Sequence, residues 1–313
     1  MLKRTLFIEN SCHVSSKLNQ LVLRNKKTDE EKQAPIEDLG VVVFENEETT
    51  FSLQAIANLN ANNVAVIFCN QNHMPTSMLL NLEGNTLQSQ LFQSQINASE
   101  PLKKQLWQQT IKSKISNQAK FLSSFGKETA FLKRCAENVK SGDTTNEEGK
   151  ASRFYWQNLF NNRFPTEAFG NDGSNRKNVF TRDRDGEPPN NLLNYGYIIL
   201  RAAVARSLTG SGLLPTLGIH HHNKYNAYCL ADDIMEPYRP WVDLLVVRSI
   251  RDFKDISVID KNIKLRLLTI LTLDVSINDS ISPLMVALSQ TTASLAECFM
   301  GERKTIKYPE FTT

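Results

Sequence analysis

Three short stretches of the sequence carry side chains that can bind a divalent metal ion. Three histidines stand in a row at 220–222, and Glu236 follows fifteen residues after His221. Upstream, two glutamates at 147–148 precede Gly149 at the expected start of a helix. Carboxylates combined with one imidazole form a hard ligand set that suits Mg²⁺ or Mn²⁺. A metal held there can polarise a phosphoryl oxygen and stabilise the oxygens that attack and leave in phosphodiester transfer.

Other catalytic patterns are absent from the sequence. There is no Walker A loop, no GxGxxG after a strand, no GxSxG and no HExxH. The stretch 183–187 resembles the opening of a calcium loop, but its twelfth position is Asn194, so an ordinary turn is expected. Spacing alone does not separate the metal site from solvated loops, because dispersed Glu and His residues are common on surfaces.

Asp233 and Glu236 can bind the same group only if the local backbone places both side chains on one face. The two residues are three apart, so they share a face if they lie in the first turn of a helix. Pro237 is tolerated in a first turn but not in a helix interior. The apolar stretch 225–231 before them fits a buried strand or turn, so a histidine and two carboxylates can converge on one point.

The pattern of apolar residues divides the chain into two parts. Up to about residue 80, short β-branched and aromatic runs predict strands, with one short helix over 51–59. From Ser99, a helix N-cap with Pro101 in the first turn, the period becomes helical. We therefore expect an α+β protein, with a small N-terminal β-rich domain at 1–95 and a larger all-α domain at 96–313.

Helices are expected in three places in the second part. The stripe 111, 115, 119 and 122 marks the first, the stretch 193–208 before Gly210 marks the second, and Ser282-Pro283 is expected to open the third. The polar stretch 165–190, rich in Gly and Pro, is predicted to be a long irregular loop.

Charge and cysteine content narrow the class of protein. The segment 100–134 holds eight basic and two acidic residues, and such a face can follow a phosphate backbone or form a solvated surface. Five scattered cysteines without a CxxC pair predict reduced thiols. The N-terminus meets Glu9 before a signal-peptide core can form, and no apolar run is long enough for a membrane span. We expect a cytoplasmic protein.

Four segments, taken together, resemble the CRISPR-associated spacer-acquisition endonuclease, the integrase subunit of CRISPR adaptation, in its type II-like form. Any one of them alone would be a weak signal, but the combined set is specific, and the order and size of the N-terminal strands also match. The segments are 141–155, 193–197, 217–221 and 231–240.

The resemblance implies a metal site formed by Glu148, His221 and Glu236. Glu148 matches the acid that stands before a glycine at a helix start, and Glu236 matches the acid of the Asp-x-x-Glu-Pro segment. Asp233 matches a nearby acid and joins the catalytic residues in a supporting role. The implied cofactor is Mg²⁺ or Mn²⁺.

Two neighbours of these residues stay open as alternatives. An alignment shifted by one position would place Glu147 or His220 in the site. The resemblance selects His221, because it follows Gly218 by three residues and precedes Glu236 by fifteen.

The resemblance implies a metal-dependent DNA endonuclease and integrase. Such an enzyme inserts short duplex DNA, the spacer, into a CRISPR repeat array by attack of 3′-hydroxyls on phosphodiesters. The N-terminal domain would serve dimerisation and the helical domain catalysis. The implied partners are the spacer-precursor duplex, repeat DNA, a second copy in a homodimer, a small CRISPR-associated adaptation protein and the type II effector nuclease, with no membrane.

Two other functions are compatible with the same residues. A metal-dependent nuclease acting on branched DNA in repair would use the same site with water in place of the attacking hydroxyl. A non-catalytic DNA-binding scaffold would need only the basic segment 100–134.

Overall fold

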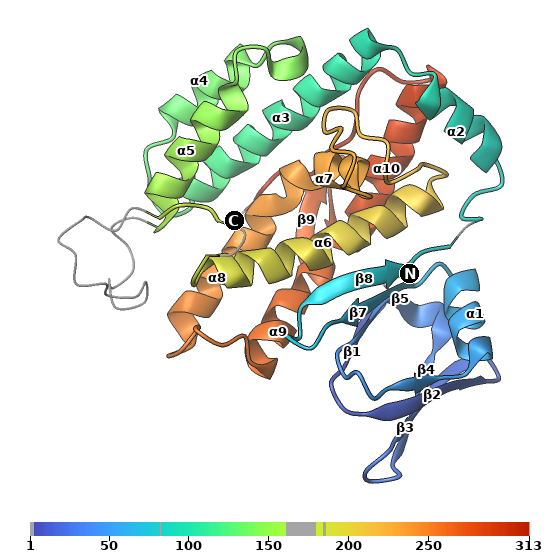
Figure 1. The fold of residues 1–313 in the computed structure, drawn as a ribbon. Coiled ribbons are helices and arrows are strands. Elements are labelled where there is room, and N and C mark those ends of the chain that lie inside the picture. The colour runs from blue at the N-terminus through green and yellow to red at the C-terminus, as the bar shows by residue number, and fades with distance from the viewer. Residues whose placement is uncertain (1–2, 82, 161–179, 184–185, 313) are drawn as a thin grey trace.

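A computed structural model describes residues 3–81, 83–160, 180–183 and 186–312. A β-rich part comes first and a helical part follows, as the change of apolar period predicts (Figure 1). The division at 95/96 itself stays a prediction. The sequence predicts a long loop at 165–190, most of which lies outside the described residues.

Two four-stranded sheets form the first part. The first has the order β1-β5-β7-β8, in which β1, β5 and β7 are parallel and β8 is antiparallel to β7. The second has the order β4-β3-β2-β6. The strands are β1 (Arg4–Ile8), β2 (Cys12–Lys17), β3 (Gln20–Asn25), β4 (Glu31–Pro35), β5 (Leu39–Phe44), β6 (Thr50–Phe51), β7 (Ala65–Cys69) and β8 (Pro75–Leu79).

The side chains of β5 and β7 pack on opposite faces of the first sheet and so contact both parts of the molecule. Side chains point alternately to opposite faces of a strand. Val41 and Val43 belong to the large core shared with the helices, whereas Val42 and Phe44 belong to a smaller core. This smaller core also holds residues of the second sheet and of α1 (Leu53–Ala61), whose N-cap is Ser52. The first sheet is thus covered on both faces, which explains the continuous apolar run of β5.

The second part is helical, with one added hairpin. Two short strands, β9 (Asp274–Ile277) and β10 (Ser280–Pro283), pair in antiparallel fashion, so Ser282-Pro283 ends a strand and the helix begins one residue later. The helices are α2 (Gln88–Ile96), α3 (Glu100–Ser123), α4 (Ala130–Asn138), α5 (Glu147–Phe160), α6 (Asn190–Gly210), α7 (Cys229–Met235), α8 (Arg239–Asp252), α9 (Lys261–Leu268) and α10 (Leu284–Met300).

Helix α6 lies at the centre of the helical part and crosses over the first sheet (Figure 1). Fifteen of its residues are buried, and it contacts β7 and β8 as well as α7, α8 and α10. Helix α3 passes behind α4 and α5, with its predicted cap Ser99 in place. Its predicted stripe of 111, 115, 119 and 122 is buried. These two helices are the frame on which the candidate site is built.

The structure bears on the predicted state of the cysteines and on the predicted absence of a membrane span. All five cysteines are free, as their spacing predicts. Among the described residues, no helix is both long enough and apolar enough to span a membrane. The cytoplasmic location stays a prediction.

Candidate active site

Glu148 is fixed at the start of α5 by a network of caps. The Asp143 carboxylate accepts hydrogen bonds from the N–H groups of Glu147 and Glu148, at 2.9 and 3.0 Å. Asn146 Oδ1 accepts the N–H of Gly149 at 3.2 Å. A Cβ atom at position 149 would lie 2.7 Å from that Oδ1 atom, so a side chain here would displace the Asn146 amide. The helix terminus therefore holds Glu148 by backbone contacts.

The loop that carries His221 folds around Asp233. The Asp233 carboxylate is completely buried in α7 and accepts the N–H of His220 at 2.9 Å and the N–H of His221 at 3.3 Å. A Cβ atom at Gly218 would lie 2.3 Å from the His221 carbonyl oxygen and 2.8 Å from Asp233 Oδ2. The Gly-x-x-His spacing thus has a physical cause, because only glycine permits this close approach.

Asp233 also orients the imidazole of His221. Its Oδ1 atom lies 2.5 Å from His221 Nδ1, and this hydrogen bond raises the pKa of His221, while burial opposes the rise. When Nδ1 carries the proton of the neutral ring, Nε2 has a free lone pair. The imidazole is half-exposed and lines a hollow of about 400 Å³. A carboxylate behind a histidine is the arrangement that orients metal-binding imidazoles.

Glu236 stands in a 3₁₀ turn, Glu236–Tyr238, between α7 and α8. Its Oε1 atom pairs with Arg239 Nη2 at 2.9 Å, and its Oε2 atom lies 2.7 Å from Lys114 Nζ. Burial would raise the pKa of Glu236, but the charges of Arg239 and Lys114 hold this pKa below its ordinary value. Glu236 therefore stays an anion although it is buried.

Lys114 brings the two predicted glutamate ligands together. Its Nζ atom is also 2.5 Å from Glu148 Oε1, so one ammonium group contacts both carboxylates. The contacting oxygens of Glu148 and Glu236 are consequently at most 5.2 Å apart, the sum of the two distances. The structure thus places residues from α3, α5 and the 3₁₀ turn at one point.

The donor set of this site suits a divalent cation. Glu236 Oε2 is buried and forms an ion pair with Lys114 Nζ at 2.7 Å, and carboxylate oxygens are ligands that Mg²⁺ and Mn²⁺ prefer. Across the described ranges, however, no three Asp, Glu, His or Cys side chains form a ready metal cluster. The Lys114 ammonium already lies between the two carboxylates. The residues fit a cation that takes the place of the ammonium.

The two alternative residues have other contacts. Glu147 pairs with Lys150 at 2.8 Å. The His220 ring stacks on Trp107 with centroids 4.1 Å apart, and burial together with the charge of His221 lowers the pKa of His220. Neither residue contacts Lys114 in a hydrogen bond or ion pair that the described chain shows. Contact with Lys114 thus distinguishes Glu148 from Glu147, whereas the choice of His221 over His220 stays a prediction.

Lys114 and Arg239 are two residues of the site that the motif pattern does not predict. Lys114 belongs to the basic segment of the sequence, but its side chain is only 7% exposed. Its position beside Ile111 and Ile115, in the apolar stripe of α3, is the sequence feature that indicates burial. Arg239 carries no such signal, because its contact with Glu236 depends on the turn between α7 and α8.

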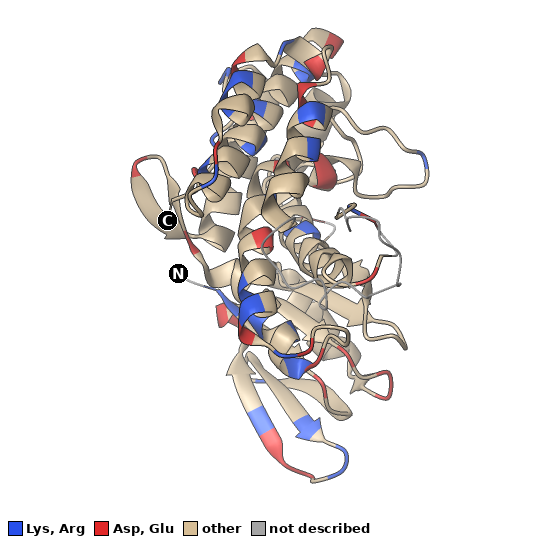
Figure 2. Cartoon of the chain, turned by 90° about the vertical axis from the view of Figure 1, so that its left-hand side faces the viewer, with Lys and Arg blue, Asp and Glu red and all other residues tan. Residues whose placement is uncertain are grey.

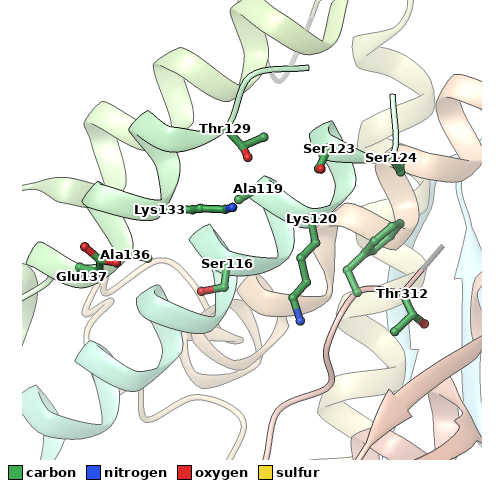
Figure 3. A pocket seen from close by; sticks show the side chains of 11 residues that line it. Ser116, Ala119, Lys120, Ser123, Ser124, Thr129, Lys133, Ala136, Glu137 and Thr312 are labelled. Atoms are coloured by element: carbon green, nitrogen blue, oxygen red, sulfur yellow. The ribbon is translucent and has the colours of Figure 1, made fainter. Parts of the chain in front are cut away.

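Basic side chains line two hollows of the helical part. One, of about 580 Å³, is lined by Arg182, Arg201 and Arg239. The other, of about 800 Å³, lies between α3, α4 and the C-terminal tail, where Lys120 and Lys133 extend among several hydroxyl groups (Figure 3). In Figure 2, Lys and Arg positions are scattered over the helices of this part with acidic positions among them. Lys114 of the segment 100–134 is buried, so this segment does not form one continuous basic surface.

A buried cluster of hydrogen-bonded side chains surrounds Asp243 of α8. Tyr155 and Tyr197 donate hydrogen bonds to its two carboxylate oxygens at 2.6 and 2.5 Å. Burial raises the pKa of Asp243 to about 6, although both tyrosines and the charge of Arg239 oppose the rise. The guanidinium of Arg239 lies 4.7 Å from the centroid of the Tyr197 ring. This cluster supports Arg239 and, through it, Glu236.

Solved structures share this architecture. A casposase bound to integration product matches with a TM-score of 0.76 and 21% identity, over 100% of this chain and 95% of that chain. A chain of a Cas6-RT-Cas1–Cas2 complex matches with a TM-score of 0.71 and 20% identity, over 96% of this chain and 35% of that one. The fold is therefore the one shared by Cas1 proteins and casposases.

Sequence comparison assigns the family. The family model described as CRISPR associated protein Cas1 matches residues 6–257. The CRISPR-associated endonuclease Cas1 of Neisseria meningitidis serogroup C (strain 8013) is 33% identical over 99% of this chain and 97% of its own length. The chain belongs to the CRISPR associated protein Cas1 family. The resemblance seen in the four motif segments is confirmed.

Proposed function

We propose that this protein is a divalent-metal-dependent DNA endonuclease and integrase that inserts short duplex DNA into a CRISPR repeat array. The observation that carries the proposal is the meeting of Glu148 and Glu236 at one buried cationic position. The names of its relatives agree, since the Neisseria meningitidis protein is called an endonuclease and the casposase structure holds an integration product.

In the proposed reaction, a 3′-hydroxyl of the short duplex attacks a phosphorus atom of the repeat. A new bond forms between that 3′-oxygen and phosphorus, and the bond from phosphorus to the repeat's own 3′-oxygen breaks. The attacking hydroxyl gives up its proton, and the departing oxygen takes one up. Little covalent chemistry falls to the protein, so positioning and charge neutralisation are its main contributions.

The residues of the site have separate parts in this proposal. Glu148, Glu236 and the Nε2 atom of His221 would hold Mg²⁺ or Mn²⁺, and Asp233 would orient His221. When bound, such an ion supplies charge stabilisation at the attacking and leaving oxygens. Arg239 keeps Glu236 in place. The arginine-lined hollow beside it offers donors for phosphate oxygens.

We propose as partners the spacer-precursor duplex, the CRISPR repeat and a second copy of the chain. The Cas1–Cas2 complex among the solved structures supports a small CRISPR-associated adaptation protein as a further partner. The type II effector nuclease stays a prediction from the resemblance.

A strand-transfer assay with purified protein tests the function. Glu148→Gln, His221→Ala and Glu236→Gln are each expected to reduce joined product by at least about 100-fold with Mn²⁺ present. Glu147→Gln is the matched control, because this neighbouring acid pairs with Lys150, and it should leave the yield nearly unchanged. A preformed duplex is offered with a repeat-containing target and an unrelated one.

Two outcomes would contradict the proposal. If the three variants join DNA as well as the wild-type protein does, these residues do not form the site. If cleavage occurs without joining, and equally on both targets, the protein is a nuclease of another purpose.

A further inference from the structure

A buried lysine occupies the centre of the proposed metal site. The side chain of Lys114 is 7% exposed, as is that of Glu236, and that of Glu148 is 34% exposed. Burial would lower the pKa of Lys114, but the charges of Glu236 and Glu148 raise this pKa above its ordinary value. The Lys114 ammonium thus contacts both carboxylates at once.

Both carboxylates need a positive charge at this point. Two carboxylates in a poorly hydrated site repel each other strongly, and the repulsion can be relieved by a proton or a cation. Arg239 contacts Glu236 on its other oxygen, so Lys114 is the cation placed between Glu236 and Glu148. Without Lys114, the site would need another positive charge.

A divalent ion between these carboxylates would compete with the ammonium. Lys114 Nζ is already 2.5 and 2.7 Å from the two oxygens that such an ion would use. An ammonium and a divalent ion repel each other, and one carboxylate oxygen lone pair cannot serve both at full strength. The lysine stem has four flexible carbons, so its head group can withdraw while the helix stays in place.

We propose that Lys114 is an exchangeable counter-ion, an inference that rests on the proposed function of this site. Without metal, its ammonium neutralises Glu148 and Glu236 and keeps them close together. When Mg²⁺ or Mn²⁺ binds, the ammonium gives up its place between the carboxylates. The lysine thus stabilises the metal-free protein and weakens metal binding.

Metal titration of a lysine variant tests the exchange. In Lys114→Met the competing charge is gone, so Mn²⁺ should bind about tenfold more tightly by isothermal titration calorimetry. The melting temperature without metal should fall, and the increase caused by Mn²⁺ should be larger than in the wild-type protein. Lys120→Met is the matched control, because Lys120 lies on the same helix and pairs with the exposed Glu310. It should leave both quantities unchanged.

A labelling experiment on the wild-type protein does not depend on how the variant folds. Acetylation of lysines by an amine-reactive reagent is followed by mass spectrometry with and without Mn²⁺. Lys114 should react slowly without metal and several-fold faster with it, whereas the rate at Lys120 should not change. A rate at Lys114 that is unaffected by Mn²⁺, or an equal or weaker Mn²⁺ affinity in folded Lys114→Met, would overturn the proposal.

The Mn²⁺ titration distinguishes a failure of the counter-ion exchange from a failure of the proposed metal site. If the wild-type protein and the Lys114→Met variant both fail to bind Mn²⁺, the metal site itself is wrong. If the wild-type protein binds Mn²⁺ and the variant binds it no more tightly, only the counter-ion exchange is wrong.

Discussion

Asp233 and Glu236 are acidic residues of the same short segment, yet their surroundings give them different tasks. Asp233 is completely buried, and its contacts are with the backbone and ring of the histidine loop. Glu236 faces Lys114 and Arg239. A carboxylate that already accepts several hydrogen bonds suits the support of a ligand, whereas one that faces only cations suits metal binding.

The supporting task of Asp233 leads to a prediction for Asp233→Asn. Asparagine has one acceptor oxygen and an NH₂ donor in place of the second oxygen, so the loop N–H groups and His221 Nδ1 lose part of their support. We expect Mn²⁺ affinity to fall by about 10- to 100-fold, which calorimetry measures. The control is His222→Ala, in an exposed neighbour. Unchanged affinity in folded Asp233→Asn would contradict the orienting role.

Asp243 leads to a prediction about pH. Its folded-state pKa of about 6 lies above the ordinary value of 3.8, so the protonated form favours folding. This contribution is complete below pH 3.8 and is lost as pH rises through 6. Asp243→Asn removes the dependence. The unfolding free energy of the wild-type protein minus that of Asp243→Asn should therefore fall by about 1.4 kcal/mol between pH 5 and pH 7.5.

Urea denaturation of both proteins at several pH values measures this difference. Overall stability can change in either direction, because other groups titrate in the same range, so only the difference reports on Asp243. A difference that stays constant with pH would show that the carboxyl group titrates alike in both states.

At the scale of single residues, the resemblance names candidate ligands but does not predict their surroundings. Glu148 and His221 follow from motif positions, and their glycine neighbours have a steric reason that the structure supplies. Lys114 was hidden because a lysine in a basic segment is usually a surface residue. Its ion-pair partners lie on α5 and in the 3₁₀ turn, 34 and 122 residues away, so only the folded structure shows that Lys114 is buried between two carboxylates.

Among the elements, α3 has a buried polar side that joins several segments. Asn117 lies one turn after Lys114, and its Nδ2 atom donates to the carbonyl oxygens of Pro237 at 2.9 Å and Pro309 at 3.0 Å. Its Oδ1 atom accepts the N–H of Phe311 at 3.0 Å. One amide therefore connects α3, the turn that carries Glu236, and the C-terminal tail.

Asn117→Ala should loosen both the tail and the turn. Removing an amide that satisfies three buried backbone groups is expected to cost about 2–4 kcal/mol of unfolding free energy. Hydrogen exchange should increase at 306–311 and around 236–238, whereas α4 should be unaffected. Ser116→Ala, in the adjacent half-buried residue, is the control. Unchanged exchange at both segments would contradict the connecting role.

The elements differ in how far the sequence predicts them. Strands with continuous β-branched runs, such as β5, and capped helices such as α3 were identified from their patterns. The strands β2 and β4 are rich in polar residues, and β6 is two residues long, so no apolar period marks them. The turn Glu236–Tyr238 was placed near a helix start, but its position between two helices depends on tertiary packing.

For the whole molecule, the change of apolar period predicts two parts but not how they meet. A buried ion pair provides one connection. Glu45, directly after β5, is 3% exposed and contacts Lys264 of α9, which is 9% exposed. Exposed His73 lies 3.1 Å from the same carboxylate. Residues 219 positions apart form this contact, so no local pattern indicates it.

This pair should behave as a coupled unit in the stability of the whole chain. Glu45→Met leaves a buried ammonium without its partner and should cost about 3–5 kcal/mol of unfolding free energy, and Lys264→Met should cost a similar amount by stranding the carboxylate. The double variant Glu45→Met with Lys264→Met buries neither charge and should lose much less than the sum. Urea denaturation of the four proteins completes the cycle. Additive losses would show that the two charges do not interact and that this ion pair contributes nothing specific to the connection of the sheet and the helices.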